Sequence, residues 1–191
     1  MNRKKFLSLA LIILAFFTSS WFFTLPLFIK IISFLATLVI FFRPPFYKII
    51  SFILFLVLLI FQFSTTRIQS VYEFSGYENY LQGQRQADYP SKLSVLGNFI
   101  ESTFESTLII HLRQNFFDCF DWLDFFKHRF FFFFFLPFLF GLYKFLRHPD
   151  YFILSLTLLF ITILTFIGPK GDYGPQILLP IIVSLIAYAA L

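Results

Sequence analysis

The chain alternates long apolar runs with short polar breaks, and one long polar segment divides it. Several runs approach the roughly 20 apolar residues that a helix needs to cross the hydrocarbon core of a bilayer. The polar segment, Ser64 to Arg129, holds eight of the ten acidic residues. We therefore expect an all-α, polytopic helical membrane protein with about six transmembrane helices and an extracytoplasmic segment of interfacial amphipathic helices.

The polar segment separates two groups of apolar runs. Residues 1–63 are expected to form three N-terminal spans, residues 64–129 the extracytoplasmic segment, and residues 130–191 three C-terminal spans. A single helix from Phe6 to Phe42 would be about 55 Å long, against a hydrocarbon core of about 30 Å. The chain must turn there, at Ser19 and Ser20, so this part forms either two spans or one span plus a re-entrant piece. The later spans are expected at Ile49–Phe63, Phe130–Tyr143, Tyr151–Ile167 and Gln176–Leu191.

The first apolar run follows a cluster of positive charge. Cations directly before a run of about ten apolar residues also fit a secretory signal peptide. Thr18, Ser19 and Ser20 make a poor cleavage site, however, and apolar sequence resumes at once. We expect an uncleaved first helix.

The positive charges predict the orientation of the spans. Cytoplasmic loops of membrane proteins carry an excess of Lys and Arg. Six spans with a cytoplasmic N-terminus place one acid, Asp150, and seven cations inside: Arg3, Lys4, Lys5, Arg43, Lys48, Lys144 and Arg147. We therefore expect both termini in the cytoplasm. The expected location is the bacterial cytoplasmic membrane, in line with the resemblance to bacterial membrane proteins given below. A five-span alternative would expose Arg43 and Lys48 outside.

The polar segment itself contains a helical pattern between Leu93 and Lys127. Leu96, Ile100, Phe104 and Leu108 recur every four residues, and a second piece from Asn115 onward is rich in aromatic residues. An amphipathic segment with Trp and Phe beside a membrane typically lies in the interface. We expect one or two helices along the outer membrane surface, with the apolar face toward the bilayer.

Composition narrows the function classes. Charged residues make up 13% of the chain, about half the share of a soluble domain. The net charge of +5 does not indicate nucleic-acid binding, because the cations cluster at the ends of apolar runs. One cysteine, Cys119, excludes an internal disulfide. No phosphate loop, zinc spacing, nucleophile elbow or dinucleotide motif is present, so no cofactor is expected.

Two sets of residues can be interpreted either as a binding site or as ordinary structural residues. Asp118, Asp121, Asp124 and His128 recur at helical spacing and can bind a divalent cation. We prefer the interpretation that they form the solvent-exposed face of an interfacial helix, so no metal site is expected. Lys30 lies inside the second span, where it either snorkels toward a helix end or meets an anionic ligand or a buried carboxylate.

One candidate binding site combines four cations on the predicted outer side. Arg85, Arg113, Arg129 and Lys170 can together hold a phosphate or a lipid headgroup, between the polar segment and the loop from Gly168 to Pro175. The alternative is that these cations neutralise the eight acids nearby.

The C-terminal third resembles a known enzyme group. Gly141-Leu-Tyr-Lys144, then Lys170 with Tyr173, then Leu178-Leu-Pro180 are similar to the late helices of multi-spanning glycosyltransferases that use polyprenyl-phosphate sugars, the protein-mannosyltransferase-like group. The resemblance implies a reduced relative of such enzymes. It assigns no catalytic residue, because the first outer turn lacks the acid of that group. The chain also resembles small uncharacterised bacterial membrane proteins of similar layout, which suggest no function.

Two functions follow as hypotheses. The preferred one is a non-catalytic membrane protein whose outer segment packs on the bilayer and contacts a partner, namely another membrane protein or a lipid such as a polyprenyl-phosphate. The alternative is an enzyme on a lipid-linked sugar, which would gather Glu73, Glu78 or Asp88 with Arg85 or Arg113 in one cleft. A channel or transporter is less expected, because Lys30 is the one charged residue within the spans.

Overall fold

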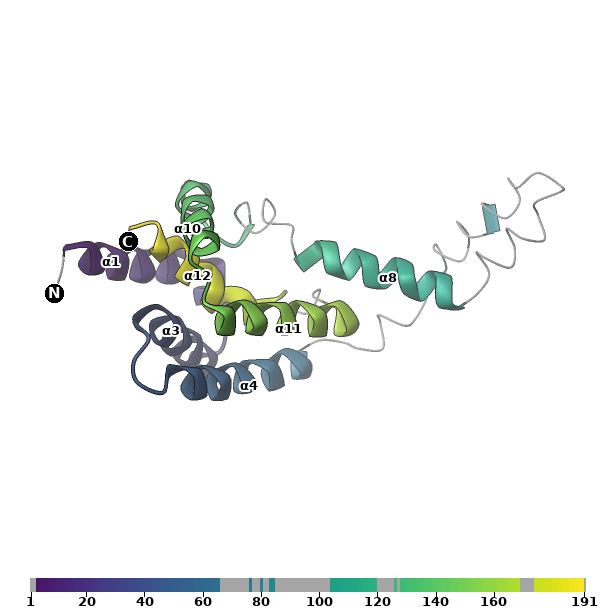
Figure 1. The fold of residues 1–191 in the computed structure, drawn as a ribbon. Coiled ribbons are helices and arrows are strands. Elements are labelled where there is room, and N and C mark those ends of the chain that lie inside the picture. Colours follow the sequence, from purple (N-terminus) through teal and green to yellow (C-terminus); the bar gives the residue numbers. More distant parts are fainter. Residues whose placement is uncertain are drawn as a thin grey trace.

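A computed structural model shows a helical protein (Figure 1). The structure describes residues 3–65, 76, 80, 83–84, 104–119, 126, 128–168 and 174–190, and these ranges contain helices, turns and no strand. The all-α prediction is therefore confirmed for this part of the chain. The helices are α1 Arg3–Thr18, α2 Ser20–Thr24, α3 Leu27–Phe42, α4 Tyr47–Thr65, α8 Phe104–Cys119, η1 Phe132–Phe134, α10 Phe135–Arg147, α11 Tyr151–Ile167, η2 Gln176–Leu178 and α12 Leu179–Tyr188.

The first apolar stretch is interrupted where the sequence predicts a turn. Ser19 caps the short helix α2, and its hydroxyl oxygen accepts a hydrogen bond from the Phe22 amide at 3.3 Å. Pro26 then precedes the first residue of α3, a position where its missing N–H costs nothing. At the other end of α3, Arg43 adopts a left-handed conformation with φ 50°, and two prolines follow before α4 begins.

Helix α12 forms the centre of the helical body. Nearly all of its residues are buried, as expected for a helix that is apolar on every side. It contacts α1, α3 and α10, and Figure 1 shows it lying among these three helices. Three buried hydroxyls lie at these contacts and donate to a carbonyl four residues earlier in their own helix: Ser8 to Lys4 at 3.1 Å, Thr37 to Ser33 at 2.8 Å and Ser184 to Pro180 at 2.7 Å. The buried Ser33 hydroxyl has no such bond.

The remaining helices attach to this body from two sides. Helix α10 packs on α12, where Gly141 allows a close approach, whereas α11 packs mainly on α8. The rings of Phe55 on α4 and Phe160 on α11 stack with their centroids 5.0 Å apart. At one end of α4, the Gln62 amide donates to the Gly174 carbonyl at 3.1 Å. These contacts join α4, α11 and the start of α12.

The run of six phenylalanines divides between two environments. From the sequence alone, the run from Phe130 to Phe135 would be interpreted as lipid-facing side chains, and Phe131, Phe132 and Phe133 are exposed. Phe130 and Phe134 are buried instead, which that interpretation did not foresee. The reason is the local geometry: the chain passes from an extended residue through η1 into α10, so it does not present one continuous helical face.

One described helix is long and apolar enough to cross a membrane, and it is Tyr47–Thr65. Shorter apolar helices are Leu27–Phe42, Tyr151–Ile167 and Gln176–Tyr188. With 13 residues, α10 is about 20 Å long. The six-span arrangement therefore stays a prediction. The bounds of α4 and α11 lie close to the expected spans, whereas α10 begins five residues later than expected.

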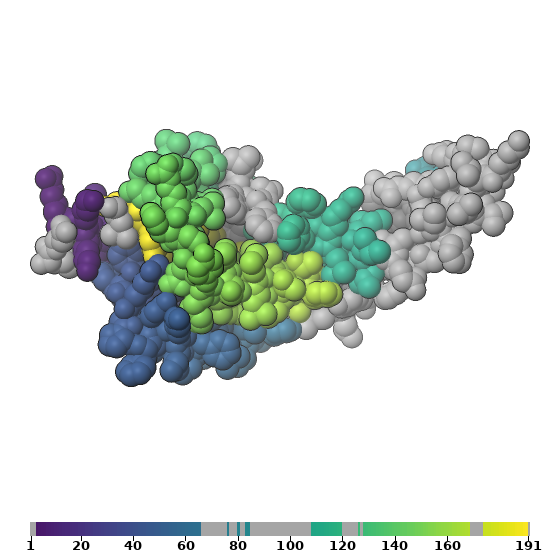
Figure 2. Space-filling model, in the orientation of Figure 1, coloured from purple at the N-terminus to yellow at the C-terminus, as the bar shows by residue number. Residues whose placement is uncertain are grey.

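Helix α8 occupies the described part of the predicted amphipathic segment. Its C-terminal half packs on α11, where the Asn115 side-chain amide donates to the Thr165 carbonyl at 3.1 Å. Ile109, Phe116 and Phe117 remain exposed. Figure 2 shows α8 against the end of α11 and projecting from the helical body. Its helical conformation is confirmed, and its position along the membrane surface stays a prediction.

Candidate functional site

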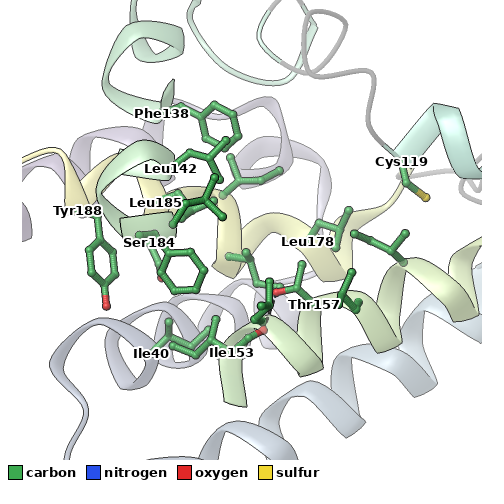
Figure 3. A pocket seen from close by; sticks show the side chains of 17 residues that line it. Ile40, Cys119, Phe138, Leu142, Ile153, Thr157, Leu178, Ser184, Leu185 and Tyr188 are labelled. Carbon is green, nitrogen blue, oxygen red and sulfur yellow. Dashed lines mark hydrogen bonds between the residues drawn. The ribbon is translucent and has the colours of Figure 1, made fainter. Parts of the chain in front are cut away.

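An apolar groove lies between α10, α11 and α12 (Figure 3). Its volume is about 190 Å³. The lining is almost entirely hydrocarbon and consists of Ile40, Cys119, Phe138, Leu142, Phe145, Leu146, Ile153, Leu154, Thr157, Leu158, Ile161, Leu178, Ile181, Ile182, Ser184, Leu185 and Tyr188.

The groove exists because two consecutive helices pack on different partners. Gly141 brings α10 directly onto α12, while α11 turns away to pack on α8. The link between α10 and α11 is only three residues long, from His148 to Asp150. The two helices therefore diverge from a common end and leave α12 as the floor of the space between them.

The groove is elongated along the helices. Tyr188 lies at one end and Cys119 at the other (Figure 3). Between Ile153 and Ile161, α11 advances about 12 Å at its rise of about 1.5 Å per residue. Leu146 and Leu158 stand on the rim and expose 59% and 54% of their surface. The groove is thus open along its rim and has apolar walls.

Hydroxyl groups in the walls do not make the groove polar. The Thr157 hydroxyl donates to the Ile153 carbonyl at 2.7 Å, and the Ser184 hydroxyl donates to the Pro180 carbonyl. Each hydroxyl is therefore bonded within its own helix. Its methyl or methylene group is the surface left for an occupant.

A polar cluster closes the Tyr188 end. The Tyr188 hydroxyl accepts a hydrogen bond from Arg43 Nη2. Arg43 Nη1 lies 3.5 Å from Asp150 Oδ2, and the Tyr47 hydroxyl donates to the same oxygen at 2.8 Å. The cluster joins the ends of α3, α4, α11 and α12.

Asp150 also begins α11. Its Oδ1 atom accepts hydrogen bonds from the Phe152 and Ile153 amides, at 3.0 and 3.4 Å, which satisfies donors that every helix N-terminus leaves open. The carboxylate side chain is only 8% exposed, whereas the Arg43 side chain is 39% exposed. The anion is thus enclosed, and the guanidinium faces outward.

The Cys119 end is closed by a neutral thiol. Cys119 is buried, and burial together with the neighbouring Asp118 charge raises the pKa of its thiol to about 12. At neutral pH the thiol is protonated and behaves as a small apolar group. It therefore continues the apolar lining of the groove.

The predicted phosphate site is only partly within the described residues. Arg129 lies over the Trp21 ring, 5.7 Å from its centre, and its carbonyl accepts a hydrogen bond from the Ser20 amide at 2.8 Å. Arg113 is exposed on α8, and neither cation lines the groove. Arg85 and Lys170 lie outside the described residues, so the four-cation site stays a prediction.

The other candidate residues have mixed outcomes. Asp121 and Asp124 lie outside the described residues, and within the described ranges no group of three His, Cys, Asp or Glu side chains can hold a metal. The Lys30 ammonium lies 5.1 Å from the centre of the Phe22 ring. This cation–π contact places it beside an aromatic side chain, and no carboxylate of the described residues pairs with it.

Sequence reasoning did not find the groove or the Arg43 cluster. Two signals were available in the chain. Gly141 stands alone in an aromatic-rich helix, where a glycine indicates close packing, and Asp150 is the single acid in the predicted cytoplasmic loops. Neither signal reveals which helices diverge.

No protein-family model, curated protein or solved structure matches the chain. Inferences about function therefore rest on the geometry of the groove and of its two ends.

Proposed function

We propose that this chain is a non-catalytic, six-span membrane protein that holds the hydrocarbon chain of a membrane lipid in the groove between α10, α11 and α12. The carrying observation is the unbroken apolar lining from Tyr188 to Cys119. An elongated space with apolar walls and an open rim fits a flexible chain better than it fits a polar substrate.

The size of the groove supports this occupant. In another protein, an apolar cavity of about 150 Å³ stays free of water and binds small hydrocarbons. The present groove is somewhat larger, at about 190 Å³, and its hydroxyls are bonded within their own helices. Water would find few partners there, whereas a hydrocarbon chain would gain dispersion contacts along both walls.

The surface supports a membrane location for the whole helical body. Large apolar side chains are exposed on many helices, among them Phe6, Leu27, Phe28, Ile60, Leu136 and Tyr151. Soluble monomers rarely expose contiguous apolar patches beyond a few hundred Å². A bilayer would cover these side chains, and it would also supply the lipid whose chain enters the groove.

The exposed face of α8 supports the expected contact of the outer segment with lipid. Ile109, Arg113, Phe116 and Phe117 are exposed on this helix. Aromatic and aliphatic residues beside an arginine are typical of a helix at a membrane surface, where the cation reaches the headgroups.

The proposal is tested with a phospholipid that carries a photoreactive group in the middle of one acyl chain. In bilayers, the purified protein should form adducts concentrated at Leu146, Leu154, Leu158 and Leu185. Thr157→Trp fills the groove and should remove most of these adducts. Thr162→Trp is the matched control, because Thr162 is exposed on the same helix and also bonds within it.

Adducts spread evenly over all apolar helices would overturn the proposal. So would groove adducts that persist unchanged in Thr157→Trp, since the side chain there would occupy the space of the lipid chain.

A further inference from the structure

We infer that the lipid in the groove is an anionic phospholipid whose phosphate lies at the Tyr188 end, on the guanidinium of Arg43. This inference rests on the proposed lipid-binding function and names the headgroup and its position. The headgroup is important for the binding free energy, because a lipid chain moves into the groove from a bilayer that is equally apolar. Hydrophobic transfer then contributes little, and the headgroup decides which lipid is preferred.

The geometry connects the chain site to a cation through one residue. Tyr188 lines the groove, and its hydroxyl accepts a hydrogen bond from Arg43. A headgroup at the end of a chain that lies along α12 therefore meets the guanidinium directly. The same residue contacts the Arg43 guanidinium with its ring, 5.9 Å from the ring centre.

Arg43 has the capacity to bind a phosphate. A guanidinium carries five N–H donors in a planar fork that matches phosphate oxygens. Its contact with Asp150 is a 3.5 Å ion pair, longer than a charge-assisted hydrogen bond of about 2.7–2.9 Å. Asp150 keeps the Tyr47 hydroxyl and two backbone amides as donors without Arg43. Arg43 can therefore turn toward a phosphate while Asp150 stays satisfied.

The backbone holds Arg43 at this position. Its left-handed conformation ends α3, its amide donates to the Val39 carbonyl at 3.0 Å, and two prolines follow. Proline fixes its own φ angle, so the two residues that follow Arg43 have little backbone freedom. The guanidinium is thus presented from a stiff corner rather than from a flexible loop.

The local charge favours an anionic lipid over a zwitterionic one. Among the described residues at the helix ends that meet here, Asp150 is the single acid. The cations at these ends are Arg43 and Lys48, and Lys144 on α10 lies beside the end of α12. Each Lys or Arg near a membrane surface strengthens the attraction for anionic lipid. Lys144 is held close by, since its ammonium donates to the Ala189 carbonyl at 2.9 Å.

The opposite end of the groove offers no comparable site within the described part of the chain. Cys119 is a neutral thiol, its neighbour Asp118 is an acid, and no described cation lines the groove there. The charge pattern therefore assigns the headgroup to the Tyr188 end. This end is separate from the phosphate site predicted from the sequence on the outer side.

The experiment uses the same photoreactive acyl chain on phosphatidylglycerol and on phosphatidylcholine, in competition, with the full-length protein in bilayers. Both lipids carry the phosphate, but phosphatidylcholine adds a choline cation that the clustered Lys and Arg side chains repel, so wild type should form groove adducts about tenfold more often with phosphatidylglycerol. Arg43→Gln should lose most of this preference. Arg147→Gln removes the same charge from a side chain that lies over the Tyr143 ring, outside the groove, and should retain it.

The outcomes separate the two proposals. Groove adducts formed equally by both lipids would overturn the headgroup inference and leave the lipid-chain proposal standing. Equal losses in Arg43→Gln and Arg147→Gln would also overturn it, because the effect would then be general surface charge. No groove adducts with either lipid would overturn both. The comparison of the two lipids on wild type decides the question even if Arg43→Gln does not fold.

Discussion

Gly141 on α10 faces the carbonyl group of Leu185 on α12 with no room for a side chain between them. A Cβ added to Gly141 would overlap the Leu185 oxygen and lie 2.8 Å from the carbonyl carbon and 3.2 Å from the Ala189 amide nitrogen. Small residues allow such close approach between helices in membranes, where dispersion contacts dominate their association. This contact positions one wall of the groove.

Gly141→Ala should therefore destabilise the protein, by about 1–3 kcal/mol from overpacking. This expected change in the free energy of unfolding is opposite in sign to that from helix propensity alone, because alanine in place of glycine usually stabilises a helix by roughly 1 kcal/mol. Thermal unfolding in detergent measures the difference. Gly83→Ala is the control, since a Cβ at Gly83 meets nothing within 4 Å. A Gly141→Ala protein that melts at or above the wild-type temperature would show that α10 and α12 are not in this contact.

Asp150 has two separable roles, and three variants distinguish them. Asp150→Ser keeps a capping oxygen for α11 but loses the charge that pairs with Arg43, while Asp150→Ala loses both. The alanine variant should be less stable than the serine variant by about 1 kcal/mol, the usual value of a helix cap. Asp150→Asn keeps a cap and the shape of the side chain, and so isolates the charge.

Denaturant titration in detergent measures the three free energies of unfolding. Equal values for the serine and alanine variants would mean that the 3.0 Å contact with the Phe152 amide contributes nothing to the stability of α11.

Cys119 should resist alkylation in the native protein. Its thiol is buried, and its folded-state pKa of about 12 lies above the ordinary value of 9.0. Below pH 9 both folded and unfolded thiols keep their proton. As the pH rises from 9 toward 12, the unfolded thiol ionises first, so this group increasingly disfavours the folded state.

N-ethylmaleimide labelling at pH 9, followed by mass spectrometry, checks this expectation. Native protein should remain largely unlabelled, and protein unfolded in dodecyl sulfate should label fully. Cys119 is the one cysteine of the chain, so no other thiol complicates the measurement. Rapid labelling of the native protein would contradict the burial of this residue at the end of the groove.

The predicted topology is tested with two introduced cysteines in a Cys119→Ser background. Pro45→Cys lies in the loop between α3 and α4, and Gly83→Cys lies in the predicted outer segment. A membrane-impermeant maleimide added to intact cells should label position 83 and spare position 45 until the membrane is opened. The reverse pattern would exclude the six-span arrangement with a cytoplasmic N-terminus.

The helices were largely predictable, because their apolar runs are bounded by strong local signals. The expected span from Tyr151 to Ile167 coincides with α11, between the capping Asp150 and Gly168. The start of α10 was less predictable. The expected span begins at Phe130, whereas the helix begins at Phe135 after an extended residue and a short 3-10 turn. A run of identical phenylalanines contains no capping residue that would mark this boundary.

The groove was beyond prediction from the sequence, for a physical reason. Hydropathy describes how each residue interacts with solvent, but a groove depends on which helices two neighbouring helices pack against. Here the packing partners depend on the close approach of α12 at Gly141 and on the hydrogen bond from Asn115 to Thr165, both between residues distant in the sequence. The predicted outer phosphate site has a similar difficulty, since its four cations come from separate segments whose approach no local pattern determines.

The buried position of α12 sets an order of events during synthesis. The larger helix contacts of α1, α3 and α10 are with α12 or with a chain neighbour, yet α12 is the last of the described helices to be made. At about 5–20 residues per second, α1 must wait on the order of ten seconds for its partner. During that wait the hydroxyls of Ser8 and Thr37 need no neighbouring helix, because each is bonded to its own backbone. If the proposed membrane location holds, α1 and α3 would lie in lipid as separate helices until α12 is made and packs against them.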